Sequence, residues 1–247
     1  MEEAEYGARL RRLRRREMTR IAWREIAGLA TCAGTLQELT DFAATTIDAA
    51  TRYAADLLAQ RHGRPAGEEA GFVVLGMGKL GGGELNFSSD VDLVFLCGHA
   101  DDTDGASPLA AEEFHLRQAR LAIRLLDAPT QDGFVLRVDM RLRPFGDSGP
   151  LVANLAFFED YLQVHGRDWE RYAYVKARAI SGTALFDTLR EELLRPFVFR
   201  RYLDFGVFES LREMKALIAR EVARRDRADN IKLGPGGIRE IEFIVQA

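Results

Sequence analysis

Residues 71–96 read GFVVLGMGKLGGGELNFSSDVDLVFL, and the fold of this chain can be worked out from this stretch. An apolar run at 72–75 ends in a glycine-rich turn, and a second apolar run occupies 93–96. Short apolar runs bounded by glycine and serine are typical of buried β-strands. We therefore expect strands over 72–76 and 91–96, joined by a turn.

Two aspartates lie where the second expected strand begins. Successive side chains of a strand point to opposite faces, so Asp90 and Asp92 are expected on one face. Adjacent carboxylates repel each other, and such a pair usually persists because a cation lies between them. The glycine turn offers backbone N–H groups, which bind phosphate well. The pattern predicts a site for a nucleotide and its divalent metal. The phosphate-binding candidates of this stretch are Gly76, Gly78, Lys79, Gly81, Ser88 and Ser89.

Three other interpretations of the glycines fit less well. Gly76-x-Gly78-x-x-Gly81 matches a dinucleotide-binding fingerprint, but Asp90 follows too soon for a crossover helix, which needs about a dozen residues. A Walker-type phosphate loop would need a glycine at position 73, where this chain has valine. A glycine-rich surface turn with two solvated aspartates on an edge strand stays open as the simplest alternative.

A second signal lies at 134–143, which reads FVLRVDMRLR and predicts a strand by its alternation. One face would carry Phe134, Leu136, Val138, Met140 and Leu142, and the other Val135, Arg137, Asp139, Arg141 and Arg143. Asp139 could complete a three-carboxylate Mg2+ site with Asp90 and Asp92, while the arginines reach phosphate oxygens. We then expect carboxylate oxygens within roughly 4–6 Å of one another. An ion-pair ladder between Asp139 and the arginines is the structural alternative.

The composition limits the class of protein. A net charge of −4 over 247 residues gives no overall basic field and weighs against a nucleic-acid partner. The chain has only two cysteines, Cys32 and Cys97, which indicates reduced thiols in a cytoplasmic protein. No run of 18 apolar residues and no signal peptide is found, so we expect no membrane association. The four histidines share no zinc-ligand spacing.

The chain divides into three expected regions: a helical region at 1–66, a catalytic core at 67–183 and a second helical region at 184–247. Within the core we expect helices over 109–127 and 168–180, and the second would carry Lys176 and Arg178 as candidate phosphate contacts. The apolar stripe that begins at Ile238 reaches Ala247 without a helix cap, which suggests a truncated element.

A glycine turn, an Asp-x-Asp pair and a later strand aspartate resemble the nucleotidyltransferase superfamily related to DNA polymerase β. Longer segments are similar to bacterial glutamine synthetase adenylyltransferase, also called adenylyl-removing enzyme. These segments are GMGKLGGGELNFSSDVDL, TQDGFVLRVDMRLRPFGDSGPLV, GRDWERYAYVKAR, RPFVFRRYLDF and NIKLGPGGIREIEFIVQ. The phrases TQDGF and FGDSGPLV look like the N-terminal, deadenylylating half of that family.

The resemblance implies an α+β fold, with a mixed-sheet nucleotidyltransferase core flanked by helical regions. It also implies phosphorolysis of adenylyl-tyrosine on adenylylated glutamine synthetase, with ADP released and a PII-type signal protein as regulator. Asp90 and Asp92 would hold one or two Mg2+ ions, and Asp139 would bind the metal that activates the attacking oxygen. Adenylylation from ATP and a non-catalytic nucleotide-binding module are the alternatives; the acidic net charge disfavours a nucleic-acid nucleotidyltransferase.

Overall fold

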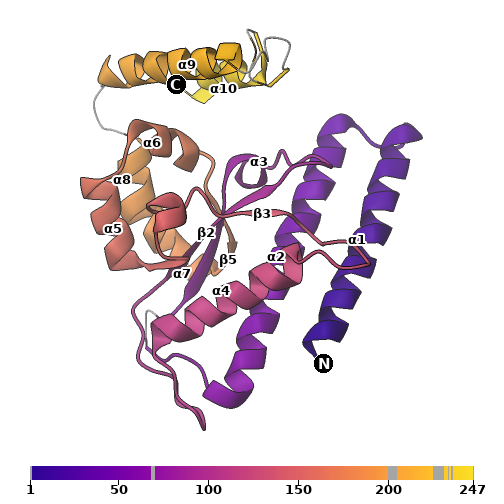
Figure 1. The fold of residues 1–247 in the computed structure, drawn as a ribbon, viewed down its shortest axis with the longest axis vertical. Helices are drawn as coiled ribbons and strands as arrows, with labels where there is room; N and C mark the ends of the chain where they lie inside the picture. The colour runs from indigo at the N-terminus through magenta and orange to yellow at the C-terminus, as the bar shows by residue number, and fades with distance from the viewer. Residues whose placement is uncertain are drawn as a thin grey trace.

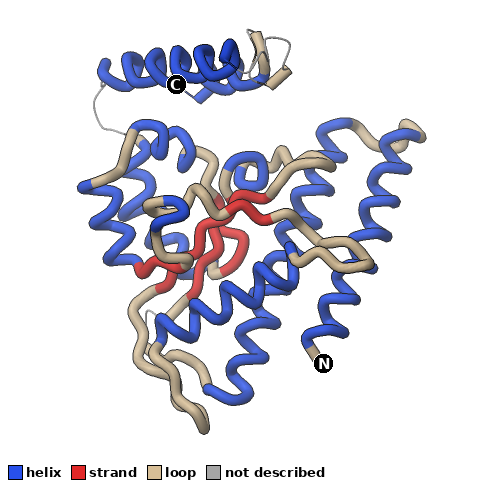
Figure 2. Tube along the Cα trace, in the orientation of Figure 1, coloured by secondary structure: helices blue, strands red, loops and turns tan. Residues whose placement is uncertain are grey.

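A computed structural model describes residues 2–67, 70–199, 205–224, 231, 232, 234 and 236–246. A mixed β-sheet lies at the centre of the molecule, with helices around it (Figure 2). The helices of residues 3–62 lie on one side of the sheet, and the helices of residues 155–198 lie on the other (Figure 1). The predicted α+β class with a mixed sheet is therefore confirmed.

Five short strands form the sheet, and they are β1 (Phe72–Gly76), β2 (Val91–Cys97), β3 (Val138–Asp139), β4 (Val152–Asn154) and β5 (Arg178–Ser181). β1 pairs antiparallel with both β2 and β5. The other edge of β2 pairs in parallel with β3 near its start and with β4 near its end. The predicted strands at 72–76 and 91–96 are confirmed, and β2 is the strand that pairs with both residues 72–76 and residues 138–139.

The first half of the chain supplies one helical layer, made of α1 (Glu3–Ile26), α2 (Cys32–His62) and α4 (Ala111–Asp127). The second half supplies α5 (Leu155–Val164), α6 (Asp168–Tyr174), α7 (Thr183–Leu189) and α8 (Arg195–Val198), with a π-helical turn at Arg190–Leu194. The predicted helix at 109–127 is thus present as α4. The final described helices are α9 (Phe205–Arg224) and α10 (Ile238–Gln246).

The sheet separates two hydrophobic clusters because alternate residues of β1 and β2 face opposite layers. Val74, Val91 and Leu93 pack with α2 and α4, whereas Leu75 and Val94 pack with α5 and α7. All of these side chains are fully buried. Asp92 alternates with Val91 and Leu93, so its carboxylate is directed to the side of the second cluster.

The turn between β1 and β2 contains the one-turn helix α3 (Gly78–Gly81). The start of the turn is anchored to β2, because the N–H of Met77 donates to the carbonyl oxygen of Asp92 at 2.9 Å. The end of the turn is anchored to α2, because the N–H of Leu85 donates to Thr40 Oγ1 at 3.1 Å. The glycine turn is therefore held to β2 at its start and to α2 at its end.

The prediction of a continuous strand over 134–143 is wrong, because β3 comprises only two residues. The N–H groups of Val135 and Leu136 both donate to the carbonyl oxygen of Leu126, at 2.8 and 2.9 Å. Both side chains are buried, so the alternation that the sequence suggested is interrupted. After Asp139 the chain turns, with the N–H of Arg143 donating to Met140.

The prediction of a helix over 168–180 is wrong in its second half. α6 ends at Tyr174, a turn closes from Ala177 N–H to the carbonyl oxygen of Tyr174, and residues 178–181 form β5. β5 supplies the hydrogen-bonding partner for the outer edge of β1, with Ala179 opposite Leu75. Tertiary pairing therefore overrides the helical pattern of the local sequence.

The elements described after residue 183 are helices. Ala247, the end of the predicted apolar stripe, lies outside the described residues. Within the part of the chain that the structure describes, no helix has the length and apolarity needed to cross a bilayer. Cys32 is exposed, Cys97 is buried, and both are free thiols.

Gly81 tests the packing of α3. A Cβ there would lie 2.0 Å from the carbonyl oxygen of Lys176 and 2.5 Å from that of Gly76, and both are backbone atoms. Gly83 has φ +75° but space around it, with Gln37 Oε1 at 3.7 Å the nearest atom. We expect Gly83→Ala to cost about 1–2 kcal/mol of the free energy of unfolding, from backbone conformation alone. Gly81→Ala should cost at least about 2 kcal/mol more, because backbone must move.

Urea unfolding followed by circular dichroism measures both variants. Equal losses of unfolding free energy at the two positions would contradict the close approach of Lys176 to α3.

Candidate active site

Asp92 and Asp139 lie side by side across the β2–β3 pair. The parallel register places Val91 opposite Val138 and Asp92 opposite Asp139. Residues in register on neighbouring strands share a face, and both valines contact the cluster under α2 and α4. The two carboxylates therefore lie together on the other face, and the structure places the strand aspartate beside the Asp-x-Asp segment.

Gly78 forms the floor beneath Asp92. Its φ is +50°, and a Cβ there would lie 2.9 Å from Asp92 Oδ2. A side chain at this position would crowd the carboxylate, so glycine allows Asp92 to rest against the turn backbone. The neighbouring Lys79 is half-buried, and among the described residues its ammonium has no hydrogen-bond or ion-pair partner. Lys79 therefore retains its capacity to bind an anion.

Asp90 is placed differently from the other two aspartates. It precedes β2, is exposed, and accepts a hydrogen bond from Arg137 Nε at 2.5 Å. The same guanidinium donates to the carbonyl oxygen of Ser88. Among the residues that the structure describes, no group of three or more His, Cys, Asp or Glu side chains is arranged to hold a metal ion. The structure thus brings two of the three predicted carboxylates together and directs the third to an arginine.

The pKa values of the two neighbouring carboxyls move in opposite directions. Burial raises the pKa of Asp92 above its ordinary value, and the charges of Asp139 and Asp90 add to the effect. The charges of Lys232 and Arg141 oppose this rise in the pKa of Asp92. Arg141 donates to both oxygens of Asp139 through its side chain, and this lowers the pKa of Asp139. Asp92 is therefore the carboxylate whose charge is less well compensated by the protein.

The paired carboxylates fit a Mg2+ ion by their chemistry. Mg2+ in phosphoryl-transfer sites is commonly held by one or two carboxylates together with substrate phosphates. Asp92 and Asp139 offer carboxylate oxygens in register, and burial, together with the charge of Asp139, raises the pKa of Asp92, an effect that a bound cation would offset. A third protein ligand is not required for such a site.

The remaining candidates of the glycine turn are occupied by internal contacts. A Cβ at Gly76 would lie within 3 Å of Ile180 and Leu80, so Gly76 serves close packing. The N–H of Gly81 donates to the carbonyl oxygen of Met77 at 3.0 Å. Ser88 and Ser89 form a turn on Asn86, with Ser89 Oγ donating to Asn86 Oδ1 at 2.7 Å. Gly78 is thus the member of the turn that borders Asp92, and Lys79 follows it in the chain.

Arg141 and Arg143 are held in different ways. Arg141 contacts Asp139, yet its side chain remains 75% exposed. Arg143 is 13% exposed and donates to the carbonyl oxygens of Met140 and Gly149, at 2.8 and 3.5 Å. Arg143 therefore holds the 140–149 loop, whereas Arg141 has freedom to reach a ligand beside Asp139.

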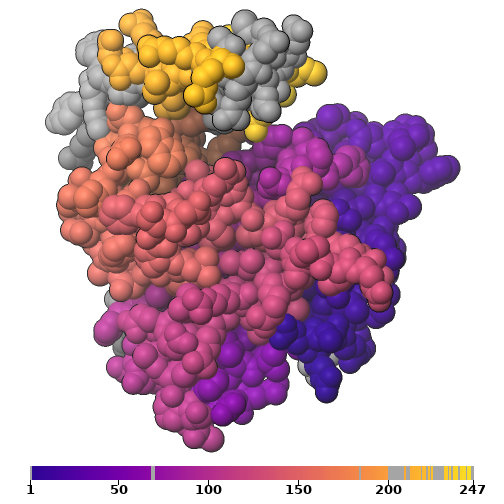
Figure 3. Space-filling model, viewed as in Figure 1, coloured from indigo at the N-terminus to yellow at the C-terminus, as the bar shows by residue number. Residues whose placement is uncertain are grey.

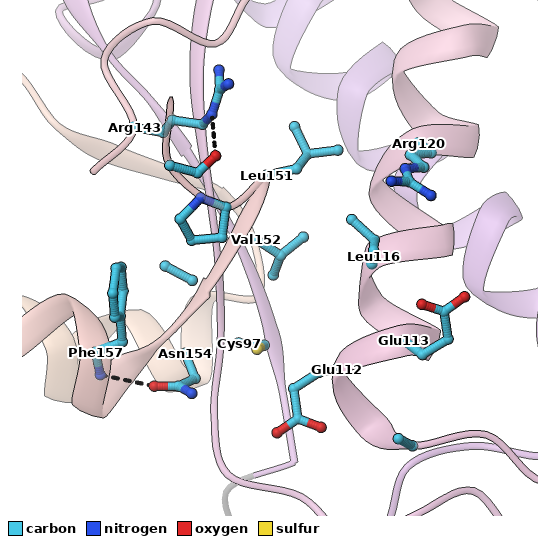
Figure 4. A pocket seen from close by; sticks show the side chains of 14 residues that line it. Cys97, Glu112, Glu113, Leu116, Arg120, Arg143, Leu151, Val152, Asn154 and Phe157 are labelled. Carbon is cyan, nitrogen blue, oxygen red and sulfur yellow. Dashed lines mark hydrogen bonds between the residues drawn. The ribbon is translucent and has the colours of Figure 1, made fainter. Parts of the chain in front are cut away.

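A cavity of about 750 Å³ lies between α4 and β4, and Arg143 is on its rim (Figure 4). Arg120 and Leu116 of α4 face Leu151 and Val152 across it (Figure 4). Asp90, Asp92 and Asp139 do not line this cavity. The cavity is separate from the acidic pair, and the two are joined through the 140–151 loop.

Three further cations lie outside the segments described so far. Lys176 is paired with Glu84 Oε2 at 3.1 Å, and Arg178 donates to the carbonyl oxygen of Leu80 at 3.2 Å, so both support the turn. Lys232, whose charge acts on Asp92, was not singled out from the sequence. The signal that could have drawn attention to it is a lysine two residues before Gly234, but its effect on Asp92 depends on tertiary structure.

Comparison with known proteins adds the family context. Residues 1–192 match the family model described as glutamate-ammonia ligase adenylyltransferase, and residues 212–247 match the one described as GlnD PII-uridylyltransferase. A bifunctional glutamine synthetase adenylyltransferase/adenylyl-removing enzyme of Thioalkalivibrio sulfidiphilus (strain HL-EbGR7) is 55% identical over 249 residues. The match covers 100% of this chain and 26% of that relative, so the chain spans about a quarter of the relative's length.

The raised pKa of Asp92 predicts how stability depends on pH. A carboxyl whose pKa is higher in the folded state favours folding at low pH and loses that contribution as pH rises through the folded pKa. Asp92→Asn, with metal chelated, should therefore raise the melting temperature near neutral pH. A gain of about 1 kcal/mol would appear as about 2–4 °C, and it should vanish below the ordinary aspartate pKa of about 4.

Asp139→Asn is the matched variant, and we expect it to change the melting temperature in the opposite direction. The pKa of the Asp139 carboxyl is lowered in the folded state, so its ionised form stabilises the fold above the unfolded pKa. Replacing the carboxylate with an amide should therefore lower the melting temperature near neutral pH. Thermal unfolding followed by circular dichroism at both pH values measures the two variants. Destabilisation by Asp92→Asn at neutral pH would mean that Asp92 is a structural partner of the neighbouring cations.

Proposed function

Because this chain belongs to the glutamate-ammonia ligase adenylyltransferase family, we propose that it removes adenylyl groups from glutamine synthetase by Mg2+-dependent phosphorolysis. The observation that carries the proposal is the register pairing of Asp92 with Asp139 against Gly78. Nucleotidyl transfer needs fixed groups that neutralise the oxygens around the reacting phosphorus. An acidic pair beside a glycine turn and an unpaired lysine meets that need.

The residues of the site would have different roles in the reaction. Asp92 and Asp139 would hold Mg2+, which when bound neutralises charge on the phosphoryl group being transferred. Lys79, beside Gly78, would contact the phosphate of the adenylyl group. An oxygen of inorganic phosphate would then bond to the adenylyl phosphorus while the bond from that phosphorus to the tyrosine oxygen breaks. The phenol oxygen takes up a proton, and ADP leaves.

Arg141 is the arginine best suited to hold the attacking phosphate. Its guanidinium is largely exposed and contacts Asp139, so a phosphate beside the acidic pair would lie within its reach. Arginine binds phosphate through two parallel hydrogen bonds, which orients as well as attracts it. Arg143 is committed to backbone carbonyl oxygens and would support the loop instead. Arg137, bound to Asp90 and Ser88, would hold the segment that enters β2.

The direction of transfer rests on the sequence likeness of 130–134 and 145–152 to the deadenylylating half of the family. Adenylylation of glutamine synthetase from ATP would use the same carboxylates and is the second candidate. The relative of Thioalkalivibrio sulfidiphilus is described as performing both activities, and this chain corresponds to about a quarter of it. A non-catalytic nucleotide-binding module is the third candidate, and the presence of the paired carboxylates speaks against it.

A PII-type signal protein is proposed as the regulator. The support is the match of residues 212–247 to a family described by its action on PII. That family is described as a uridylyltransferase, whereas the family matched by residues 1–192 is an adenylyltransferase. Uridylyl and adenylyl transfer use different bases but the same phosphate chemistry. If residues 212–247 serve both kinds of transfer, they would act on the phosphates and not on the base. Free thiols and a nucleotide-dependent reaction fit the cytoplasm as its location.

The decisive assay supplies adenylylated glutamine synthetase, Mg2+ and inorganic phosphate, and measures ADP by chromatography. We expect phosphate-dependent ADP release, and Asp92→Asn should lower its rate by about 10³-fold or more. Asp132→Asn is the matched control, because Asp132 lies in an exposed turn and pairs with Arg15 at 3.3 Å. Transfer from ATP to unmodified glutamine synthetase, without phosphate-dependent release, would instead establish the adenylylating direction. Nucleotide binding without either reaction would establish the module.

Arg141→Lys separates the attacking phosphate from the nucleotide. Lysine retains the charge but supplies no planar pair of donors. The phosphate concentration for half-maximal rate should rise about tenfold, equivalent to about 1.4 kcal/mol, while the affinity for ADP changes much less. Equal weakening of both ligands would show that Arg141 serves the nucleotide or the fold.

A further inference from the structure

The loop that joins β3 to β4, residues 140–149, is shaped by two consecutive turns. In the first turn the N–H of Arg143 donates to the carbonyl oxygen of Met140 at 3.3 Å. In the second the N–H of Gly146 donates to the carbonyl oxygen of Arg143 at 2.8 Å. A Cβ at Gly146 would lie 3.5 Å from the carbonyl oxygen of Arg141, so the second turn folds back onto the first. The backbone that carries the Arg141 guanidinium therefore depends on how the second turn is held.

Phe145, in the second turn, has a left-handed backbone with φ +60° and ψ +12°. Among the described residues it is the only one other than glycine with a positive φ. This conformation is unfavourable for an L-residue, because its Cβ crowds the neighbouring carbonyl oxygen. Such strain persists where the surrounding contacts fix it, and it occurs most often at functional sites. The contacts of Phe145 therefore show what holds the loop.

The ring of Phe145 rests on one face of α5. Its centroid lies 4.7 Å from that of Tyr161, with the ring planes at 70°, and 5.0 Å from that of His165. A third ring, that of Phe157, lies 6.1 Å away. Edge-to-face pairs at these separations are favourable. The surface of the loop continues into that of α5 and α6 along the pink and salmon region of the space-filling view (Figure 3).

Tyr161 is itself fixed by a buried carboxylate. Its hydroxyl donates to Glu170 Oε1, both side chains are buried, and Glu170 Oε2 accepts the N–H of Arg167 at 2.9 Å. Burial and the bond to Glu170 raise the pKa of Tyr161 to about 12, so its hydroxyl stays protonated and remains a donor. The hydroxyl of Tyr174, the last residue of α6, donates to the carbonyl oxygen of Leu142 at 3.4 Å. Helices α5 and α6 thus hold both turns of the loop.

We propose that Phe145 is a positioning residue, which clamps the loop 140–149 onto Tyr161 and so orients Arg141 toward the phosphate beside Asp139. This inference rests on the proposed function, because it assumes that Arg141 binds the attacking phosphate. Phe145 acts through the backbone of the loop. Its loss leaves the charge of Arg141 in place but allows the guanidinium more orientations, and misplaced groups bind and react less well.

The phosphate dependence of ADP release from adenylylated glutamine synthetase tests the assignment in the full 247-residue chain. Phe145→Ala should raise the phosphate concentration for half-maximal rate about fivefold, the scale of one edge-to-face ring contact. The affinity for ADP, measured by competition against a fluorescent ADP analogue, should change less than about twofold. Phe145→Tyr keeps the ring and should restore the phosphate dependence of the unmodified chain.

Phe199→Ala is the matched control. Phe199 follows α8, its side chain is also exposed, and we expect its loss to leave the phosphate requirement unchanged. Amide hydrogen exchange gives a second measurement that does not depend on activity. Exchange in residues 140–149 should be faster in Phe145→Ala and unchanged in Phe199→Ala.

A double-mutant cycle with Arg141→Lys separates positioning from general support of the fold. If Phe145 acts through Arg141, adding Phe145→Ala to Arg141→Lys should raise the phosphate requirement further by less than about twofold. Independent structural effects would instead multiply, and the full fivefold rise would appear in both backgrounds.

Two outcomes would overturn the assignment alone. Multiplying effects in the cycle would make Phe145 a structural residue that acts independently of Arg141. An unchanged phosphate requirement in Phe145→Ala would show that the two turns hold Arg141 without the ring. Failure of the underlying function is distinct, because the unmodified chain would then release no ADP with phosphate, and the role of Phe145 toward phosphate would fall with it.

Discussion

The parallel register between β2 and β3 holds Asp92 and Asp139 side by side, and the surrounding contacts serve this pair of like charges. Backbone hydrogen bonds fix the strands, so the carboxylates cannot move apart without breaking the pairing. Burial raises the pKa of Asp92, and the charge of Asp139 adds to the effect. Arg141 compensates the charge of Asp139, whereas the charge of Asp92 is less compensated, and this imbalance is what the proposed Mg2+ ion would relieve.

The position of Asp139 depends on the end of α4. Leu126, in the last turn of that helix, accepts the N–H groups of both Val135 and Leu136. The chain is therefore held against the helix until Arg137, and only the next two residues pair with β2. A longer strand would continue the alternation but would leave no room for the turn that brings Arg141 back onto Asp139. The shortness of β3 is thus part of the construction of the site.

The arginines near Asp139 were expected either to form ion pairs with carboxylates or to bind phosphate. Arg137 and Arg141 do form ion pairs with Asp90 and Asp139, as a structural ladder would require. Both pairs are exposed on the arginine side, where solvent screens the attraction and the net stabilisation is small. The structure thus shows the ion-pair arrangement, and phosphate binding by the more exposed Arg141 stays a prediction.

The sequence by itself determined the helices and strands whose formation depends on residues close to them in the chain. The apolar runs bounded by glycine and serine identify β1 and β2, because a buried strand needs little beyond its own side chains. Helical periodicity identifies α4. The Asp90–Asp92 spacing and the later Asp139 predict an acidic site, because neighbouring carboxylates repel each other and usually need a cation between them.

Only the tertiary structure decided which of these residues meet. β5 forms where a helix was expected because the open edge of β1 needs a partner, and that requirement lies a hundred residues away in the chain. Asp90 pairs with Arg137, and Arg143 donates to backbone carbonyl oxygens instead of remaining free for a ligand. These contacts are set by hydrogen bonds and ion pairs between segments that are far apart in the chain. The local sequence around each residue therefore does not predict them.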